Sequence, residues 1–288
     1  MLKIVGLIIV LMIMVFTVVT RIIPEDRRPD THNPVAELGK GIRDSINSVD
    51  ELAPNLSDAL DLSEALDHVD KALPKLPQLV SEEKPVFVSA DHSGKDFAHQ
   101  NLPNANFASA RISDAQFNGA LLDSASFEGA SGVGVNLTNA RLANANLNAL
   151  QLTKSDLSGA DLRRAAARAS DLRETKFVEG DISFASFSSA VLSGADFRQA
   201  YGAGATFLDA DLTKADFAGA DLVGARFDGA TLSGAIFAGA DLEQASFTGT
   251  NIANTDLSHA VNLTTAQLVD ACADLRTRLP EGVVAGKC

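Results

Sequence analysis

The sequence predicts an all-β solenoid, a four-sided β-helix in which short strands stack into a rod. The first observation behind this prediction is a five-residue period: from Phe97 to Leu257, every fifth residue is Leu, Phe or Ile in 30 of 33 cases. We call each of these 33 residues the centre of its five-residue unit. The second observation is that the residue two positions before the centre is Ala in 23 of 33 cases. A period kept over this length is the signature of an architecture in which each unit packs only on its neighbours.

The number of sides follows from the positions of phenylalanine. All 12 central Phe residues are separated by ten residues or a multiple of ten, so Phe recurs on alternate sides only. This alternation requires an even number of sides. Two sides would enclose no interior, and six would leave a pore that close-packed protein interiors do not tolerate. Four sides give about eight coils, each with Phe on two opposite walls and Leu on the other two.

The N-terminal part, residues 1–29, is predicted to be a transmembrane anchor with its flank. Residues 4–20 form an uncharged apolar run between Lys3 and Arg21, at the short end of the range for a spanning helix. A cleaved signal peptide is the alternative, but no small-residue cleavage site follows the run. Basic residues after the run favour a single-pass protein of a bacterial inner membrane with its bulk in the cytoplasm. Lys3 favours the opposite, periplasmic orientation.

Residues 30–84 are predicted to form an amphipathic helical connector. Asn33-Pro34 is typical of a helix start, and apolar residues then recur at steps of three and four over 35–52 and over 62–73. Both stripes are too short to predict a coiled coil. Packing on the rest of the protein or on each other is therefore favoured, and a stalk that makes a homo-oligomer is the alternative.

The repeat units resemble those of a known family. Units such as A-D-L-T-K (210–214), A-D-F-A-G (215–219) and A-D-L-V-G (220–224) are similar to those of the pentapeptide-repeat family, and the resemblance covers residues 95–259. The fold that it implies is a right-handed quadrilateral β-helix with one pentapeptide per side. The centre and the small residue two before it then point inward. We assign residues 85–260 to this β-helix.

Residues 261–288 are predicted to be a C-terminal cap helix and tail, an ending that resembles that of bacterial members of the family. Thr264 and Gln267 form a capping box, and three residues share one stripe of the expected helix: Leu268, Cys272 and Leu275. The tail brings Cys288 back toward Cys272. A disulfide between them is expected if the domain is periplasmic, and two reduced thiols are the alternative.

The sequence predicts no enzyme, no cofactor and no metal site. The common hydrolase, phosphate-loop, dinucleotide-binding and zinc-protease motifs are absent, and the five histidines have no metal-ligand spacing. The glycine-rich stretches 132–134 and 202–204 lie in the repeat frame with no helix after them. A local bulge or kink explains these two stretches better than a phosphate loop does.

The formal net charge of −13 argues against direct binding of nucleic acid. Some members of the family resemble DNA and inhibit gyrase, so the acidic surface is relevant. Of the 19 acids in the repeat, 11 stand directly before a centre, where turn chemistry accounts for them. Residues 141–176 have a net charge of +3, whereas 177–257 have −8. A basic band in the middle does not fit a continuous mimic of duplex DNA.

The basic band supplies the candidate partner surface. Arg141 and the pair Arg163–Arg164 are expected on one wall, one coil apart. Tyr201 follows in the acidic column of that wall, and Tyr is enriched at interface hot spots. A solvated surface without a partner is the alternative. The residues of the candidate surface are Arg141, Arg163, Arg164, Arg168, Arg173 and Tyr201.

These observations favour a non-enzymatic, membrane-tethered scaffold or docking module for an unidentified protein partner. The first alternative is an acidic DNA mimic that binds and inhibits a type II topoisomerase such as gyrase. The second is a structural protein of the periplasmic envelope. The fold is argued from the residues, whereas the function rests on the resemblance.

Overall fold

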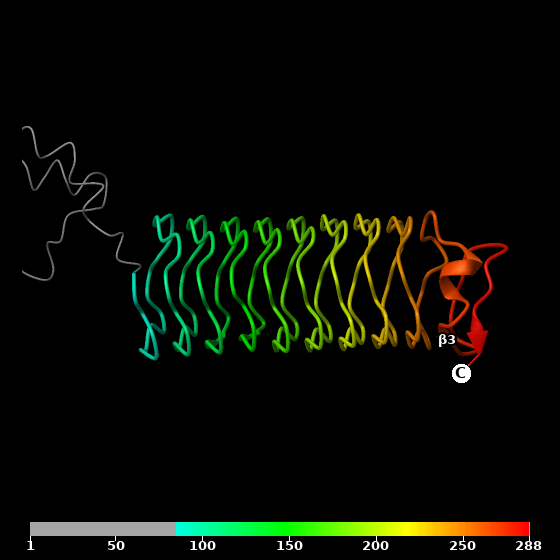
Figure 1. The fold of residues 1–288 in the computed structure, drawn as a ribbon, viewed down its shortest axis with the longest axis horizontal. Coiled ribbons are helices and arrows are strands. Elements are labelled where there is room, and N and C mark those ends of the chain that lie inside the picture. Colours follow the sequence, from blue (N-terminus) through cyan, green and yellow to red (C-terminus); the bar gives the residue numbers. More distant parts are fainter. Residues whose placement is uncertain (1–84, 288) are drawn as a thin grey trace, which may run out of the picture. The chain divides into compact units, whose positions relative to one another are not determined.

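The computed structural model describes residues 85–287, which form a stack of similar coils (Figure 1). Parallel bridges join each strand position to the position twenty residues later, for example Asp161 to Asp181 and Asp181 to Tyr201. Twenty residues are four pentapeptides, so each coil has four sides. The four-sided β-helix predicted from the spacing of phenylalanine is confirmed.

We name the four walls by the centres of early pentapeptides. Wall A contains the unit centred on Phe97 and the units every twenty residues after it. Walls B, C and D are defined in the same way from Leu102, Phe107 and Ile112. Phe centres lie on walls A and C, and aliphatic centres lie on walls B and D.

Each pentapeptide has the same local structure. The residue before the centre makes the bridge, the centre points inward, and the next two residues form a turn. The second turn residue has a positive φ, such as 59° at Asn104. The acidic or amide side chain before the centre often closes this turn, as where Asp181 Oδ1 accepts a 3.0 Å hydrogen bond from the N–H of Ser183. The frequent Asp and Asn at this position therefore have a structural role.

The interior is filled by the centres and by the small residues two positions before them. Phe217 and Ala215 both have an exposed fraction of 0%. Along wall A the rings of Phe217 and Phe237 stack with centroids 4.9 Å apart. Phe207 on wall C meets Phe217 edge to face at 5.7 Å. Both arrangements are favourable for aromatic quadrupoles, so the two Phe walls support each other through the core.

The phenylalanine ladders are interrupted between Phe127 and Phe177, where the centres are smaller. The buried positions two before the centres are often larger there: Val135, Leu150, Ser155, Ser170 and Thr175. The hydroxyl groups of Ser155, Ser170 and Thr175 make hydrogen bonds inside the stack. Ser155 Oγ accepts a 3.0 Å bond from the N–H of Val135, and Thr175 Oγ1 donates to the carbonyl of Leu152. The burial of these polar groups is thereby offset.

Glycine replaces the expected centre at two positions because neighbouring side chains occupy the space. A Cβ on Gly132 would lie 2.9 Å from Val135 Cγ2, and a Cβ on Gly202 would lie 2.9 Å from Leu222 Cδ2. Gly132 lies in strand β1 (Ser131–Val133), which pairs in parallel with β2 (Gln151–Thr153). The unit at 202–204 keeps the regular bridge and turn. The bulge or kink predicted at 202–204 is therefore wrong.

The C-terminal end differs from the predicted cap helix. It contains one short 3-10 helix, η3 (Thr265–Leu268), followed by the parallel strands β3 (Cys272–Ala273) and β4 (Gly286–Lys287). Leu268 is buried but Leu275 is fully exposed, so the predicted apolar stripe is wrong. Figure 1 shows this end as an irregular closing turn on the last coil.

Hydrogen bonding at the end of the stack explains why strands replace the helix. The predicted capping box of Thr264 and Gln267 is confirmed, and within it the side chain of Gln267 accepts a 2.8 Å bond from the N–H of Thr264. Its amide donates to the carbonyl groups of Leu242 and Ala245 at 2.7 and 2.9 Å. Cys272 then bridges to Asn251. A continued helix would leave this strand edge unpaired, which is unfavourable.

Two predicted segments lie outside the described residues: the membrane anchor, 1–29, and the helical connector, 30–84. From residue 85 to 287, no helix has the length and apolar character needed to cross a bilayer.

We predict that Phe217→Ala lowers the free energy of unfolding by about 3–5 kcal/mol, because it removes a buried ring and leaves a cavity. Chemical denaturation at equilibrium measures this loss. The matched control is Phe184→Ala, whose ring is 64% exposed and whose loss should be below about 1 kcal/mol. Equal losses for the two variants would contradict the inward assignment of the repeat centres.

Candidate functional site

Outward side chains form straight columns because the stack repeats every twenty residues. The bridge column of wall B contains most of the predicted surface residues. As predicted, Arg141 and the pair Arg163–Arg164 lie on this wall one coil apart, since Arg141 bridges to Asp161. The column runs through Arg141, Asp161, Asp181, Tyr201, Asp221 and Asp241. Arg168 lies on wall C, and Arg173 lies on wall D.

Three arginines of the basic band are paired with carboxylates. Arg163 makes a two-pronged contact with Asp161, at 2.8 and 2.6 Å. Arg173 does the same with Asp171, and Arg141 Nη2 lies 2.8 Å from Asp123.

These contacts lower the pKa values of the acidic partners, but they add little to the stability of the rod. The hydrogen bond from Arg163 holds the pKa of Asp161 below its usual range, and the bond from Arg173 lowers the pKa of Asp171. Exposed ion pairs of this kind contribute little to stability. Their main effect is to neutralise much of the positive charge that the sequence places in the band.

Two arginines of the band have no carboxylate partner in the described part of the chain. Arg168 donates from Nε to Ser186 Oγ at 3.2 Å. Arg164 is exposed at a turn position with φ 60° and makes no side-chain bond among residues 85–287. The free positive charge of the band is therefore concentrated at Arg164 on wall B and at Arg168 on wall C.

Two aromatic side chains stand exposed on wall B, beyond the basic band. Tyr201 is 58% exposed and Phe184 is 64% exposed. The ring of Phe184 covers Gly204, where a Cβ would lie only 2.7 Å from Phe184 Cε1. The ring above Gly204 is the structural reason for glycine there, since its φ of 65° is close to the 60° that Arg164 adopts at the equivalent turn position.

The sequence analysis missed Phe184, although the repeat contains a signal that could have found it. Every other Phe from Phe87 onward lies at a centre position, ten residues or a multiple of ten from the next. Phe184 alone is out of this frame. A large aromatic residue at an outward turn position exposes apolar surface to water and adds nothing to the packed core.

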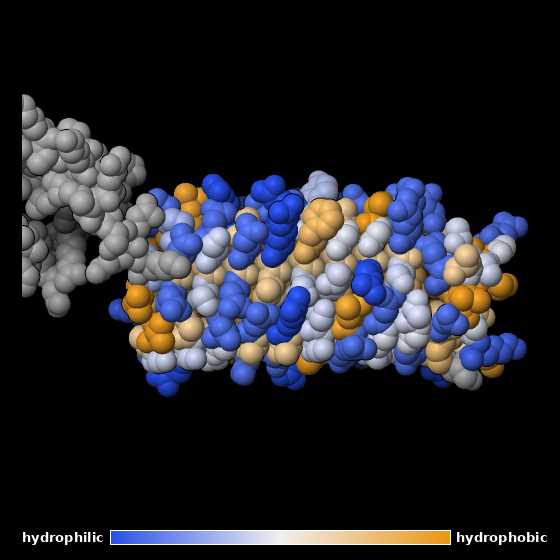
Figure 2. All heavy atoms as spheres, in the orientation of Figure 1, coloured by the Kyte–Doolittle hydropathy of each residue, from blue (hydrophilic) through white to orange (hydrophobic). Residues whose placement is uncertain are grey.

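The surroundings of the two rings are acidic on both sides along the column. Asp181 precedes Tyr201 by one coil and Asp221 follows it by one coil. Asp221 Oδ1 accepts a bond from the N–H of Val223 at 3.2 Å, which turns its carboxylate toward the 222–224 turn. Figure 2 shows one face of the rod as mostly hydrophilic, with single apolar side chains between the polar ones.

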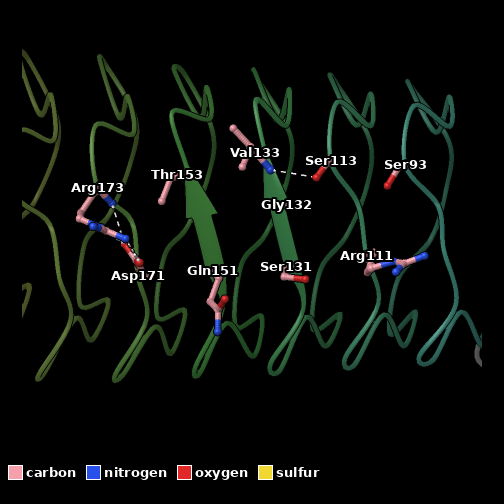
Figure 3. A pocket seen from close by; sticks show the side chains of 10 residues that line it. All are labelled: Ser93, Arg111, Ser113, Ser131, Gly132, Val133, Gln151, Thr153, Asp171 and Arg173. Atoms are coloured by element: carbon pink, nitrogen blue, oxygen red, sulfur yellow. Dashed lines mark hydrogen bonds and ion pairs between the residues drawn. The ribbon is translucent and has the colours of Figure 1, made fainter.

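A shallow hollow of about 390 Å³ lies on wall D (Figure 3). Its floor includes Ser131 and Gly132 of β1, and the outward side chain of Ser131 is small. Arg111 and Arg173 stand at its two ends, as Figure 3 shows. Arg173 is the one residue of the predicted surface that lines it.

The hollow is polar and its charges are paired. Ser113 Oγ accepts a 3.3 Å bond from the N–H of Val133, and Arg111 contacts Asp91 at 2.6 Å. Hydrogen bonds from Ser93 and then from Arg111 lower the pKa of Asp91 to about 2. Within residues 85–287, no three His, Cys, Asp or Glu side chains gather at a spacing that suits a metal ion.

The predicted pairing of Cys272 with Cys288 stays a prediction, because Cys288 lies outside the described residues. The register of the last strands is compatible with it. Cys272 pairs with Gly286 and Ala273 pairs with Lys287, so the end of the described chain runs beside Cys272.

The comparison with protein-family models agrees with this geometry. The family model for pentapeptide repeats matches eight overlapping segments that together span residues 93–261. No curated protein matches the sequence. Matching solved structures include trypsin-treated QnrB1, a plasmid-mediated fluoroquinolone resistance protein, at 20% identity and a TM-score of 0.37 over 66% of this chain and 90% of that one. HetL from Nostoc sp. strain PCC 7120, involved in heterocyst differentiation regulation, matches at 26% identity and a TM-score of 0.26 over 67% and 92%.

The family model covers more than half of the chain, in the same frame as the bridges and the buried centres. The five-residue frame, the four-sided coil and the sequence match describe the same segment. The chain belongs to the pentapeptide-repeat family.

Proposed function

We propose that this chain is a non-enzymatic docking module for protein–protein interaction, tethered to a membrane through residues 4–20. One observation carries the docking proposal. Wall B exposes two large aromatic rings, Phe184 and Tyr201, beside Arg164, whose guanidinium has no partner among residues 85–287. Exposed aromatic and Arg side chains are the residues that most often dominate binding energy at protein interfaces.

The shape of the stack favours docking over catalysis. Its interior is filled by apolar side chains, and the outward residues stand on flat walls at a coil spacing of ~4.8 Å. Substrate sites are usually concave and bury most of a small ligand. A flat wall with aligned columns is better suited to an extended protein surface.

The membrane tether and the location are proposals from the sequence. The apolar run at 4–20 supports an anchor at a bacterial inner membrane, and the basic residues after it support a rod in the cytoplasm. A periplasmic location is the alternative, and a Cys272–Cys288 disulfide would favour it, because disulfides persist in oxidising compartments.

A second candidate function is binding to a type II topoisomerase as a mimic of DNA. The observation that favours it is the row of carboxylates at Asp181, Asp221 and Asp241 on wall B. Tyr201 interrupts that row, and Arg163 and Arg164 lie one coil before Asp181, where the row begins. The docking proposal accounts for these interruptions, whereas a continuous phosphate-like charge pattern does not.

We predict that the double change Arg164→Glu and Arg168→Glu lowers the yield of proteins cross-linked to the full-length chain in its native membrane at least tenfold. The reason is that these two guanidinium groups have no carboxylate partner within the described stack. Quantitative mass spectrometry of the cross-linked material measures the yield. Arg198→Glu on wall A, where Arg198 is paired with Asp196, is the control and should leave the yield unchanged. An unchanged yield in the double variant would leave the band as a solvated surface.

The topoisomerase alternative predicts inhibition of DNA supercoiling by gyrase. We expect the purified full-length protein to have no effect at micromolar concentration, because the charge row is interrupted. A gel assay of plasmid supercoiling measures this. Inhibition that disappears in an Asp221→Asn, Asp241→Asn variant would replace the docking proposal with the DNA mimic.

The location is tested by thiol labelling of Cys272 and Cys288 in intact cells with a membrane-impermeant reagent, before and after reduction. Labelling only after lysis is expected for a cytoplasmic rod. Labelling of intact cells only after reduction would place the rod in the periplasm with a disulfide. In that case gyrase would be excluded as a partner.

A further inference from the structure

The outward side chains of wall B change in character along the rod. In the bridge column, an apolar residue and the cation Arg141 come first, two carboxylates lead to Tyr201, and two further carboxylates and an apolar residue follow it. Arg163 and Arg164 add two cations at the turn of the Asp161 coil. The column itself runs through Leu121, Arg141, Asp161, Asp181, Tyr201, Asp221, Asp241 and Val261.

We propose that wall B is the contact surface between two copies of this chain, packed wall to wall with their rods antiparallel. This inference rests on the proposed docking function and names the partner of the docking wall. An interface between identical subunits is usually isologous, so the same patch must be complementary to itself. The order of side chains on wall B has this property.

The symmetry of the contact follows from the stack. The two-fold axis lies in the contact plane, at right angles to the rod and midway between the coils of Asp181 and Tyr201. It reverses the order of the coils and places each column opposite the same column of the second copy. Position 181 then faces position 201 of the second copy, and 161 faces 221. In the same way 141 faces 241, and 121 faces 261.

The column contacts that result are complementary. Arg141 faces Asp241 of the second copy, and Leu121 faces Val261 of the second copy, which is 46% exposed. The hydroxyl of Tyr201 faces the carboxylate of Asp181 of the second copy and can donate to it. Each of these three contacts occurs twice, once on either side of the axis.

The turn positions complete the pattern. Arg164 faces Gly224 of the second copy, where no side chain stands in its way. The carboxylate of Asp221 of the second copy is turned toward that same turn by its bond to the N–H of Val223. The unpaired guanidinium therefore meets the carboxylate that has no cation partner in its own stack. The one like-charged contact, Asp161 facing Asp221 of the second copy, is offset by Arg163, which binds Asp161 at 2.6 Å.

The aromatic rings lie beside the axis. Phe184 faces the Gly204 turn of the second copy, which that copy's own Phe184 ring covers, so the two rings come to lie next to each other. Two copies of Phe184 and of Tyr201 thereby lose solvent exposure together, which is the main gain expected from an exposed apolar patch. A parallel arrangement of the rods is unfavourable, because it places Asp221 and Asp241 opposite themselves.

The proposal is tested with two differently tagged full-length chains, co-expressed and retrieved through one tag after mild solubilisation. One variant reverses the cations, with Arg141→Glu and Arg164→Glu. The other reverses the carboxylates, with Asp221→Arg and Asp241→Arg. We expect each variant to retrieve itself at least tenfold less than the unchanged chain does. A mixture of the two variants should restore retrieval, because every reversed charge then faces an opposite charge.

The matched control reverses two charges on wall D, with Arg173→Glu and Asp211→Arg, and should retrieve itself normally. Retrieval that persists in both wall B variants, or that the mixture does not restore, overturns the proposal. An unchanged chain that does not retrieve itself also overturns it. If that chain instead cross-links to a different protein and Phe184→Ala abolishes the cross-link, wall B docks another partner and the proposed function stands. If neither self-retrieval nor any cross-link depends on wall B, both the contact between two copies and the proposed docking function are overturned.

Discussion

The closure of each coil into four walls around a narrow interior is the constraint on which the rest of this structure depends. Four central side chains must fill each layer, and only a small residue fits beside each of them. The stacked rings of wall A, such as Phe217 and Phe237 at 4.9 Å, repeat at the spacing of the coils themselves. An insertion of one residue would move every later centre to the outside. The five-residue frame is therefore kept from Phe97 to Leu257 without a slip.

The same constraint explains the exceptions. Where the centres are smaller, buried residues such as Val135 and Thr175 occupy the space or satisfy backbone groups. Glycine at 132 and 202 leaves space that neighbouring side chains occupy. These departures from the repeat are compensated locally, and the bridges continue across them in the same register.

A core that is fixed in this way leaves the outward positions free to carry function. The walls of this chain differ in what they present. The charged residues at the ends of the hollow on wall D form ion pairs. Wall B instead combines Arg164, which has no partner in the described stack, with the exposed rings of Phe184 and Tyr201. Binding requires groups that are not already satisfied by their own chain, which is why the proposals concern wall B. The surface of the rod, not its fold, distinguishes one member of such a family from another.

The sequence by itself determined the number of walls, the inward residues and the column in which each outward residue stands. This was possible because every unit contacts only its neighbours and the coil repeats every twenty residues. The place of a residue within this period therefore specifies its wall and its column. The tertiary structure decided the pairing of Arg163 with Asp161, the packing of the Phe184 ring over Gly204 and the closing strands β3 and β4. Each of these depends on a contact that the repeat pattern does not specify, made either by a long side chain or by the unpaired edge of a strand. The C-terminal residues show the reason most directly: their local pattern favours a helix, but the unpaired edge of the last coil stabilises strands.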